Sequence, residues 1–496
     1  MIRVENGDLN INIDLIRSEL GTQSPMVVKH FYIGIDQPLE AAIIYVNGLV
    51  NQDIIDRDLL NPLMIHINEN LNGKVGIGDY LCKRYISMSN AFVELDFNLI
   101  IHNLKRGKTA VLINGASEVI IADTTGGLQR AIIEPMNETA AKGPRDGFVE
   151  NLDTNISIIR RKVKDKNLTI ELFSVGRRLQ SDVAMVYISD VADKGVLDNL
   201  RNRIEAVDVD AVLSAGKLEQ YIEDYPYTVF PQAFSTERPD RAIANMLEGK
   251  VILVTEGTPM VITYPAMFMQ FFQAEEDYTE RTVVASFVRL LRILAACIVI
   301  TLPSIYLTLI KFNVELIPIK FVTPIIQSRS GIALTPFLEI IAMEMVVEFL
   351  REGGLRLPTK IAQTLSLVGG IIIGDTAIKS KMVSPTTLLI VGITVIATFL
   401  IPNYDMSLSI RMIRFPMLLL ANIMGIFGIA VGWFLLLVHL SSLDSLGVPY
   451  FEFHKSDMKD TFIRAPLWKM NKRPEGIPNQ NPIRQTDFRN KFKKKR

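Results

Sequence analysis

The C-terminal third of the sequence contains long runs of apolar residues without a charge. The run from Ile293 to Ile310 has 18 residues and no Asp, Glu, Lys or Arg. About 18–20 such residues in a helix span the roughly 30 Å hydrocarbon core of a bilayer. Val383–Ile401 is a second such run and Phe415–Leu440 a third. The sequence therefore predicts an integral membrane protein with a transmembrane helical domain at residues 285–445.

The chain before residue 285 has no run of this kind and should fold in water. Its N-terminus reads Met-Ile-Arg-Val-Glu-Asn-Gly-Asp, with polar and acidic residues where a signal peptide needs a basic start and an apolar core. We therefore expect the soluble part, including an N-terminal extension at residues 1–25, to stay in the cytosol.

Two blocks of the soluble part recur at one constant offset. Ala41–Asp56 and Val183–Asp198 each contain an apolar strand, a polar turn and a helix start, and they align without gaps 142 positions apart. A later block has a helix ending at glycine, a strand, a glycine turn and a second strand, and it recurs at the same offset. Its matched residues include Gly107 with Gly249, Lys108 with Lys250 and Gly115 with Gly257. Two separate blocks with one offset predict an internal duplication.

The repeated blocks predict the domain organisation and the fold class. We expect two small α/β domains, at residues 26–130 and 150–265, joined by a connector at residues 131–160. The predicted fold class is α/β plus all-α membrane, with two tandem duplicated small α/β domains before a helical transmembrane domain. Residues 446–496 form a basic cytosolic tail.

The residues that carry chemistry in enzymes are scattered in this chain. No GxGxxG precedes a helix, and no GxxxxGK[ST], HExxH or GxSxG motif occurs. The five histidines have no partner at ligand spacing, and Cys82 and Cys297 lie far apart. The formal net charge of zero gives no indication of nucleic-acid binding. We expect no enzyme activity, no catalytic residues, no bound metal and no cofactor.

Basic residues beside the apolar runs predict which side of the membrane they face. Arg289 and Arg292 precede the first run, and Lys379 and Lys381 precede the second. The tail after Tyr450 has 13 Lys/Arg and 5 Asp/Glu. The positive-inside rule places these three flanks in the cytosol and the short loop Pro402–Ser409 outside.

With both chain ends inside, the number of crossings must be even, so a return is expected between Ile332 and Ile378. Ile332–Leu350 is apolar but carries three glutamates: Glu339, Glu344 and Glu348. A carboxylate at the centre of a lipid-facing helix costs about 2.5–3.5 kcal/mol. These residues therefore either pair with Arg351 or Arg356 in a packed or interfacial helix, or line an aqueous path.

The next stretch, Ile361–Ile378, is short and carries three glycines on or near one face: Gly369, Gly370 and Gly374. Small residues let helices approach closely, either in ordinary packing or around a symmetric pore. Short segments at membrane depth persist only where protein or a water-filled cavity surrounds them. We expect four full crossings and one partial or interfacial helix.

Several long motifs resemble the A subunit of the GerA-type spore germination receptors of endospore-forming Firmicutes. The soluble ones are GPRDGFVENLDTNISIIRRK (Gly143–Lys162), FPQAFSTERPDR (Phe230–Arg241) and EDYTER (Glu276–Arg281). The membrane one is MEMVVEFLREGGLRLPTKIAQTLSLVGGIIIGDTAI (Met343–Ile378). Many members have Gly-Gln where this chain has Gly374-Asp375. The resemblance therefore leaves the branch of the family open.

The resemblance implies a germinant receptor subunit in the spore inner membrane. It would work with a transporter-like B subunit, which binds the nutrient, and with a lipoprotein C subunit. It would assemble into a homo-oligomeric ring, a pentamer in this family, and act as a nutrient-gated channel for monovalent cations. The glutamates in the apolar stretch Ile332–Leu350 agree with this, since intramembrane carboxylates suit a cation path.

We therefore take two sets of residues as candidate sites. The pore or gate set is Glu339, Glu344, Glu348, Val368, Gly369, Gly370, Ile372 and Gly374, with Val368, Gly369 and Ile372 as an apolar constriction. The set for coupling between domains or subunits is Gly143, Pro144, Arg145, Arg238 and Asp240. The alternative to a pore role for the three glycines is ordinary close packing of helices.

Three other functions stay open. One alternative is an accessory spore-membrane protein of the same family that does not respond to nutrients itself. Another is a secondary transporter component, although the repeat in this sequence is parallel and lies in the soluble part. A membrane-bound enzyme lacks a nucleophile or metal set.

Overall fold

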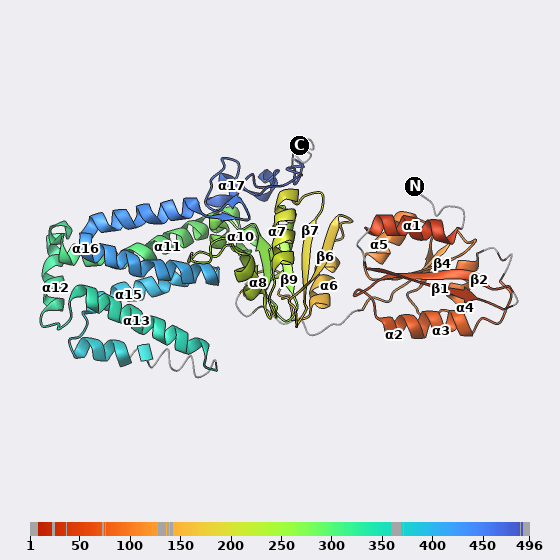
Figure 1. The fold of residues 1–496 in the computed structure, drawn as a ribbon, viewed down its shortest axis with the longest axis horizontal. Helices are drawn as coiled ribbons and strands as arrows, with labels where there is room; N and C mark the ends of the chain where they lie inside the picture. Colours follow the sequence, from red (N-terminus) through yellow and green to blue (C-terminus); the bar gives the residue numbers. More distant parts are fainter. Residues whose placement is uncertain are drawn as a thin grey trace.

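The computed structural model describes residues 8–21, 25–35, 37–71, 74, 76–126, 135, 138, 142–358, 369–370, 372–486 and 488–489. Within these residues the chain forms two units that each contain a five-stranded sheet, followed by a helical region. Figure 1 shows the first unit at the right, the second in the middle and the helical region at the left.

The first unit is a sheet with helices on both faces. All its strand pairs are antiparallel, in the order β1-β2-β4-β5-β3. The strands are β1 (Met26–Ile33), β2 (Leu39–Val46), β3 (Phe92–Glu94), β4 (Thr109–Ile113) and β5 (Val119–Ala122). One face packs on α1 (Leu9–Leu20) and α5 (Phe97–Leu104). The other packs on η1 (Ile55–Leu60), α3 (Asn61–Ile65) and α4 (Ile77–Arg84), with the short α2 (Gln52–Ile54) leading into η1, so β2 and β4 are largely buried on both faces.

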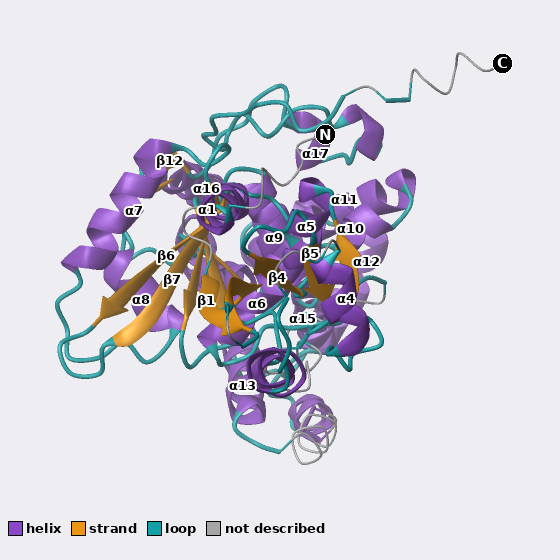
Figure 2. Ribbon diagram, turned by 90° about the vertical axis from the view of Figure 1, so that its right-hand side faces the viewer, coloured by secondary structure: helices purple, strands orange, loops and turns teal. Residues whose placement is uncertain are grey.

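The second unit has the same arrangement, with strand order β6-β7-β9-β10-β8. Its strands are β6 (Leu168–Val175), β7 (Ser181–Ile188), β8 (Phe234–Thr236), β9 (Val251–Thr255) and β10 (Val261–Tyr264). One face packs on α6 (Leu152–Lys162) and α9 (Pro239–Leu247), the other on α7 (Lys194–Ala206) and α8 (Ala215–Ile222). Figure 2 shows these strands with helices on either side.

The two sheets also share their register. Ala42 pairs with Leu112 in the first sheet, and Ala184 pairs with Val254, 142 positions further along, in the second. The predicted helix, glycine, strand, glycine turn and strand are confirmed in both units. The glycines at these turns all have positive φ, which glycine adopts without steric cost: Gly107, Gly115, Gly249 and Gly257.

A short segment leads from the second unit into the helical region. It contains η2 (Phe268–Phe272) and α10 (Glu276–Thr279) and continues into α11 (Thr282–Lys311). The remaining elements are η3 (Val314–Leu316), α12 (Ile319–Arg329), α13 (Pro336–Leu355), a helical stretch at 372–379, α15 (Pro385–Thr398) and α16 (Tyr404–Ser442). After α16 come β11 (Asp444–Ser445), β12 (Val448–Pro449), α17 (Met458–Thr461) and η4 (Leu467–Lys469).

Helix α16 is two helical segments that fold back on each other at Gly425. This residue has the non-helical angles φ 61° and ψ −137°. A Cβ placed on Gly428 would lie 2.1 Å from the carbonyl oxygen of Leu420. In a straight helix these positions would be about 12 Å apart. Residues 404–424 and 426–442 are therefore antiparallel, as Figure 1 also shows.

The turn of α16 lies at the end of α11 that is distant from the second unit. Lys311, at the C-terminus of α11, donates to the carbonyl oxygen of Asn422 at 2.8 Å. The two other ends of α16 contact the second unit, because Ser409 donates to the carbonyl of Val229 and His439 lies 2.9 Å from the Thr228 hydroxyl. The chain thus leaves the second unit in α11 and returns to it at the end of α16.

By length and composition, two helices of the described residues could cross a membrane: Thr282–Lys311 and Tyr404–Ser442. The predicted span Val383–Ile401 is the 14-residue helix α15, because Ser384 caps its N-terminus and Pro385 begins it. The predicted span Phe415–Leu440 does not run as one straight helix, because the chain reverses at Gly425.

Two basic flanks that were predicted on the same side of the membrane lie at opposite ends of the helical bundle. The Tyr306 hydroxyl, near the C-terminus of α11, lies 3.2 Å from the Thr387 hydroxyl at the start of α15. Lys379 and Lys381 precede α15, so they lie at the end of the bundle opposite Arg289 and Arg292. The physical reason is that α13 and the stretch at 372–379 both run along the bundle, which adds a second traverse (Figure 1).

The loop Pro402–Ser409, predicted to lie outside, is at the end of the bundle that contacts the second unit. Of Pro402–Ser409, the part from Tyr404 onward is helical, with Asn403 as the N-cap, and Ser409 contacts the second unit.

The basic tail also folds onto the second unit. Gln480 donates to the carbonyl of Val191 at 2.9 Å, and Arg473 donates to that of Leu247 at 2.7 Å.

The reversal of α16 predicts the effect of adding a methyl group at Gly428. Gly428→Ala should lower the stability by about 1–3 kcal/mol, because its Cβ would overlap a backbone oxygen that cannot move alone. Gly392→Ala in α15 is the matched control, since its Cβ meets nothing within 4 Å and should stabilise the helix by up to about 1 kcal/mol. Melting temperatures of both variants in detergent would test this, and equal values would contradict the antiparallel arrangement.

Candidate functional site

The three predicted pore glutamates lie on α13, and each pairs with an arginine. Glu339 is buried near the far end of the bundle, where its carboxylate lies 2.6 Å from Arg329. It also accepts hydrogen bonds from the Ser384 amide at 3.1 Å and the Thr387 hydroxyl at 3.0 Å. This carboxylate therefore holds the N-terminus of α15 against α13.

The other two glutamates pair with the first segment of α16. Glu344 lies 2.6 Å from Arg414, and Glu348 lies 2.8 Å from Arg411 and 3.2 Å from Arg414. The prediction that these glutamates pair with Arg351 or Arg356 is wrong. Residues 404–424 pack beside α13 and bring Arg411 and Arg414 close to Glu344 and Glu348. Arg356 instead pairs with Glu352, and Arg351 lies over the ring of Phe399.

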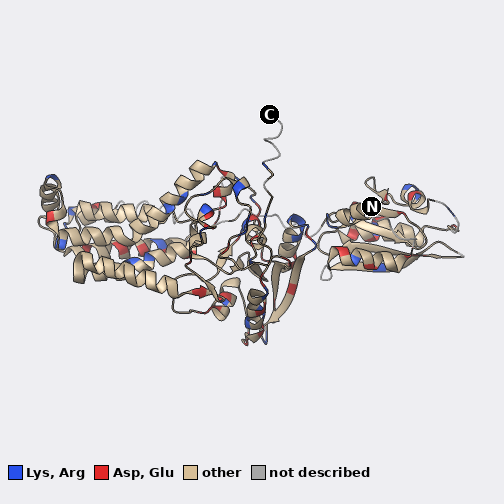
Figure 3. Cartoon of the chain, turned by 90° about the horizontal axis from the view of Figure 1, so that it is seen from above, with Lys and Arg blue, Asp and Glu red and all other residues tan. Residues whose placement is uncertain are grey.

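The charges of the helical region are concentrated in few places. Figure 3 shows that most of the length of its helices carries uncharged side chains, with charged ones at the ends and in one internal group. The glutamate and arginine pairs of α13 and α16 belong to the part of the bundle near the second unit. Buried charges are tolerated only when they are paired, so these contacts fix the two helices relative to each other.

The predicted gate residues lie at 368–374. Val368 lies outside the described residues, so its prediction stays untested. A Cβ on Gly369 would lie 3.2 Å from the side chain of Leu350 in α13, and one on Gly374 would lie 3.5 Å from Leu388 in α15. A Cβ on Gly370 would meet nothing within 4 Å, and Ile372 is exposed. Close helix packing thus accounts for Gly369 and Gly374, whereas Gly370 and Ile372 face away from these neighbours.

Four of the five predicted coupling residues come together in the second unit. The buried Arg238 pairs with Asp240 at 2.6 Å, in the first turn of α9. Its guanidinium also donates to the carbonyl of Pro144 at 3.3 Å and lies close to Gly143. Arg145 is exposed. Arg238 thereby attaches the chain before α6 to the N-terminus of α9.

A buried charge cluster that the sequence analysis missed joins the second unit to α11. Asp277 of α10 is 2% exposed and lies 3.2 Å from Arg289 and 2.8 Å from Arg292. Arg289 also lies 2.9 Å from Asp460 of α17. The two arginines, predicted as a cytosolic flank, are thus internal partners. Their spacing of three residues, after the acidic segment before α11, was the available signal.

A second buried network connects η2 to the sheet of the second unit. Lys250, which is 1% exposed, donates to the amide oxygen of Gln270, whose amide nitrogen donates to Asn245 at 2.9 Å. Burial lowers the pKa of Lys250 to about 7, with Glu248 opposing this shift and Arg241 adding to it. Arg241 in turn donates to the carbonyl oxygens of Gln270 and Gln273. The segment before α11 is therefore held to α9 and β9 by polar contacts.

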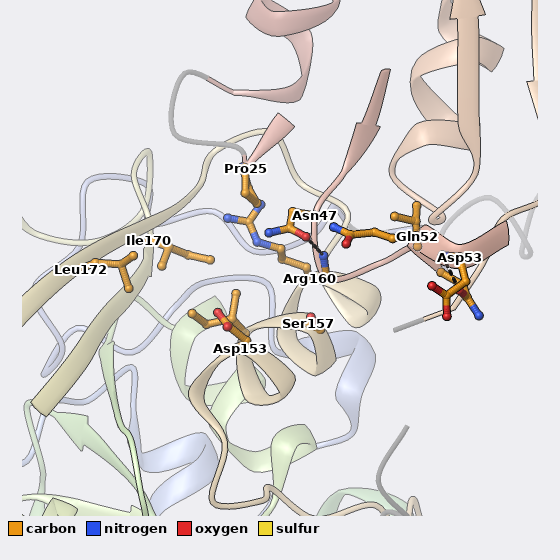
Figure 4. A pocket seen from close by; sticks show the side chains of 13 residues that line it. Pro25, Asn47, Gln52, Asp53, Asp153, Ser157, Arg160, Ile170 and Leu172 are labelled. Atoms are coloured by element: carbon orange, nitrogen blue, oxygen red, sulfur yellow. Dashed lines mark hydrogen bonds between the residues drawn. The ribbon is translucent and has the colours of Figure 1, made fainter. Parts of the chain in front are cut away.

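A cavity of about 560 Å³ lies where the two units meet (Figure 4). The first unit contributes residues from the turn after β2, and the second contributes α6 and β6. Its lining residues include Pro25, Asn47, Gly48, Asn51, Gln52, Asp53, Asp153, Ile156, Ser157, Arg160, Ile170 and Leu172. A Cβ on Gly48 would lie 2.5 Å from the Ser157 hydroxyl, so glycine permits this close contact of the units.

Arg160 is the cation of this cavity. Its Nε is buried without a hydrogen-bond partner in the described structure. Burial lowers the pKa of Arg160 to about 10, with no opposing carboxylate, so the guanidinium is still charged at neutral pH. Asp153 also borders the cavity and lies in the first turn of α6. A site with one under-compensated cation among amide and hydroxyl groups suits a small anion.

No group of three or more His, Cys, Asp or Glu side chains in the described part of the chain is arranged to hold a metal ion. The two cysteines are not bonded to each other.

Comparison with known proteins identifies relatives along nearly the whole chain. A family model described as Bacillus/Clostridium GerA spore germination protein matches residues 14–476. Spore germination protein KA of Bacillus subtilis (strain 168) is 36% identical over 96% of this chain and 87% of its own length. The uncharacterized membrane protein YfkQ of the same organism is 36% identical over 91% of this chain and 88% of its own length. The crystal structure of the N-terminal domain of the A subunit of the Bacillus megaterium spore germinant receptor GerK3 matches 54% of this chain and 99% of its own, with 30% identity and a TM-score of 0.43.

The buried Lys250 predicts a pH dependence of stability. Its folded pKa of about 7 lies below its ordinary value of 10.5, so the unfolded chain binds more protons between these pH values. The free energy of unfolding should therefore rise with pH across this window, by at most about 1.4 kcal/mol per pH unit, and each kcal/mol adds roughly 2–4 °C to the melting temperature.

Lys250→Met should remove most of this rise. Lys108→Met is the matched control, because Lys108 holds the equivalent position in the first unit and lies beside Phe92 only half-buried. Melting temperatures from pH 7 to 10 would compare the three proteins. An equal slope in Lys250→Met and the parent protein would contradict the assignment.

Proposed function

The chain belongs to the GerA family of spore germination proteins, and from this premise we propose that it is the A subunit of a nutrient germinant receptor. The single observation that carries the proposal is the family match over residues 14–476. In this role the protein sits in the spore inner membrane, its helical region crosses the bilayer several times, and its two α/β units face the cytosol.

The exposed side chains of the helical region support the membrane placement. Along the apolar part of α16 only 33% of the residues are buried within the chain. The large exposed side chains there include Leu419, Ile423, Phe427, Phe434 and Leu435. In water such a surface would be strongly unfavourable, since soluble monomers rarely expose contiguous apolar patches of this kind. Lipid is the environment that suits it.

The charged groups of α13 and α16 support a cation channel. Glu344 and Glu348 line the interface with Arg411 and Arg414, so in this arrangement their charges are neutralised within the protein. A shift of α13 along residues 404–424 would separate these pairs and expose carboxylates to a water-filled path. Rings of carboxylates attract cations, and a homo-oligomer, taken as a pentamer, would supply such a ring.

The partners follow from the same family role. A transporter-like B subunit binds the nutrient, and a lipoprotein C subunit completes the receptor. The protein acts without enzymatic chemistry, cofactor or nucleic acid. The alternative is an accessory membrane protein of the same family that does not itself respond to nutrients.

The two units derive from one ancestral unit by tandem duplication. The supporting observations are the common strand order and the strand pairs that recur at a constant offset in the sequence. Two unrelated units would share a strand order by convergence more readily than they would share every register.

The cavity between the units favours a second function, binding of a small carboxylate. Arg160 supplies the charge, and Asn47, Gln52 and Ser157 supply hydrogen-bonding groups beside the apolar Ile156 and Ile170. A free amino acid matches this combination of a carboxylate, polar partners and an apolar side chain. Binding there would change the contact between the units, because both contribute to the walls.

The channel role predicts a leak when the constriction is widened. Purified protein in potassium-loaded liposomes should show faster basal potassium efflux with Val368→Ala than with the parent chain, because a smaller apolar ring is easier to wet. Val391→Ala, at a buried position of α15, is the matched control and should leave efflux unchanged. Identical efflux from the parent and Val368→Ala would remove this residue from the gate.

The ligand role predicts an arginine-dependent thermal shift. Excess L-leucine should raise the melting temperature of the full chain by mass action, whereas L-leucinamide, which lacks the carboxylate, should not. Arg160→Gln should abolish the shift. Arg161→Gln is the control, since the neighbouring Arg161 is exposed and donates to the carbonyl of Gly126. A shift that survives in Arg160→Gln, or its absence with every protein amino acid, would rule out this site.

A further inference from the structure

The loop between α8 and β8 of the second unit lies against both segments of α16. The hydroxyl of Ser409, in the segment 404–424, donates to the carbonyl oxygen of Val229. The hydroxyl of Thr228 lies 2.9 Å from the ring nitrogen of His439, in the segment 426–442. Two consecutive loop residues are thus attached to two antiparallel helices, which fixes the height of the loop along the bundle.

At this height the helices present apolar side chains outward. Leu408 and Met412, next to Ser409 along the first segment, are 44% and 51% exposed. Val438, directly before His439, is 51% exposed. The loop therefore lies beside the end of the apolar surface of the bundle, rather than at the top of a water-exposed domain.

The side chain of Tyr227 projects from this loop and is 99% exposed. Other large side chains at the same end of the bundle are also exposed: Phe399, Leu400 and Tyr404. Tyrosine combines an apolar ring with a hydroxyl that needs hydrogen bonds, and it is enriched where membranes meet water. A fully exposed tyrosine at the level where an apolar helix surface ends fits the headgroup layer of a bilayer.

We propose that the loop Tyr225–Val229 is a lipid-contact site through which the second unit rests on the membrane, with Tyr227 inserted among the headgroups. The inference rests on the membrane placement of the helical region proposed above. The occupant is the bilayer rather than a partner protein, because the loop continues the apolar surface of α16. The contact would set the tilt of the second unit relative to α11, which leaves the same unit.

Tryptophan fluorescence in vesicles of phosphatidylcholine and phosphatidylglycerol tests the site. In a full-length background with Trp433→Phe and Trp468→Phe, single tryptophans are placed by Tyr227→Trp, Phe434→Trp and Tyr32→Trp. Phe434 is an exposed residue in the second segment of α16, and Tyr32 is exposed on β1 of the first unit. Each variant is compared in plain vesicles and in vesicles whose phosphatidylcholine is brominated at shallow or at deep acyl positions.

The expected result for Tyr227→Trp is a blue-shifted emission and a loss of fluorescence that is larger with shallow than with deep bromine. Phe434→Trp should lose fluorescence in the lipid, and Tyr32→Trp should lose none. If Phe434→Trp is quenched while Tyr227→Trp behaves as Tyr32→Trp does, the loop contact is overturned and the membrane placement stands. If Phe434→Trp is also unquenched, the membrane placement fails and the loop contact with it. Melting temperatures equal to that of the background would show that each variant is folded.

Discussion

The contact of Asp277 with Arg289 and Arg292 determines how the soluble units and the helical region are joined. All three side chains are buried, and removal of one charge from such a group costs several kcal/mol because the others are left unpaired. Helix α11 can therefore neither rotate nor slide relative to α10 without separating opposite charges. Asp460 of α17 extends this group, so the C-terminal part of the chain is attached at the same point. These contacts couple any movement of α10 or α17 to α11.

The same physical constraint recurs inside the bundle. Two arginines, Arg411 and Arg414, pair with two glutamates, Glu344 and Glu348, so the charges of these four side chains balance. In this arrangement neither carboxylate is available to attract a cation. A conducting state under the proposed function would need α13 and residues 404–424 to exchange partners, and the free energy of separating the pairs would hold the path closed until a signal supplied it.

The sequence predicted those parts of the fold that depend on local pattern. Strands buried on both faces and glycines with positive φ are visible in one stretch of chain, so the repeated units and their turns could be found. The partners of the glutamates could not, because Glu344 and Arg414 are distant in sequence and meet only after α16 packs on α13. The reversal at Gly425 was missed for a different reason. The run around it is apolar except for Asn422 and the glycines, and hydropathy cannot distinguish a turn among apolar side chains from a continuous span.

The two units have the same strand order, but equivalent positions in them contact different parts of the chain. Lys108 of the first unit lies at the surface over Phe92, whereas the equivalent Lys250 is covered by Gln270 of the segment that leads into α11. The lysine position used for attachment in the second unit thus has different neighbours in the first. The first unit touches the rest of the chain near α6, where Arg160 faces the cavity. Helix α6 packs on the same face of the second sheet as α9, and α9 carries Arg241, which holds η2. A change at the cavity could therefore be transmitted to α11 through α6, α9 and the segment at 268–281.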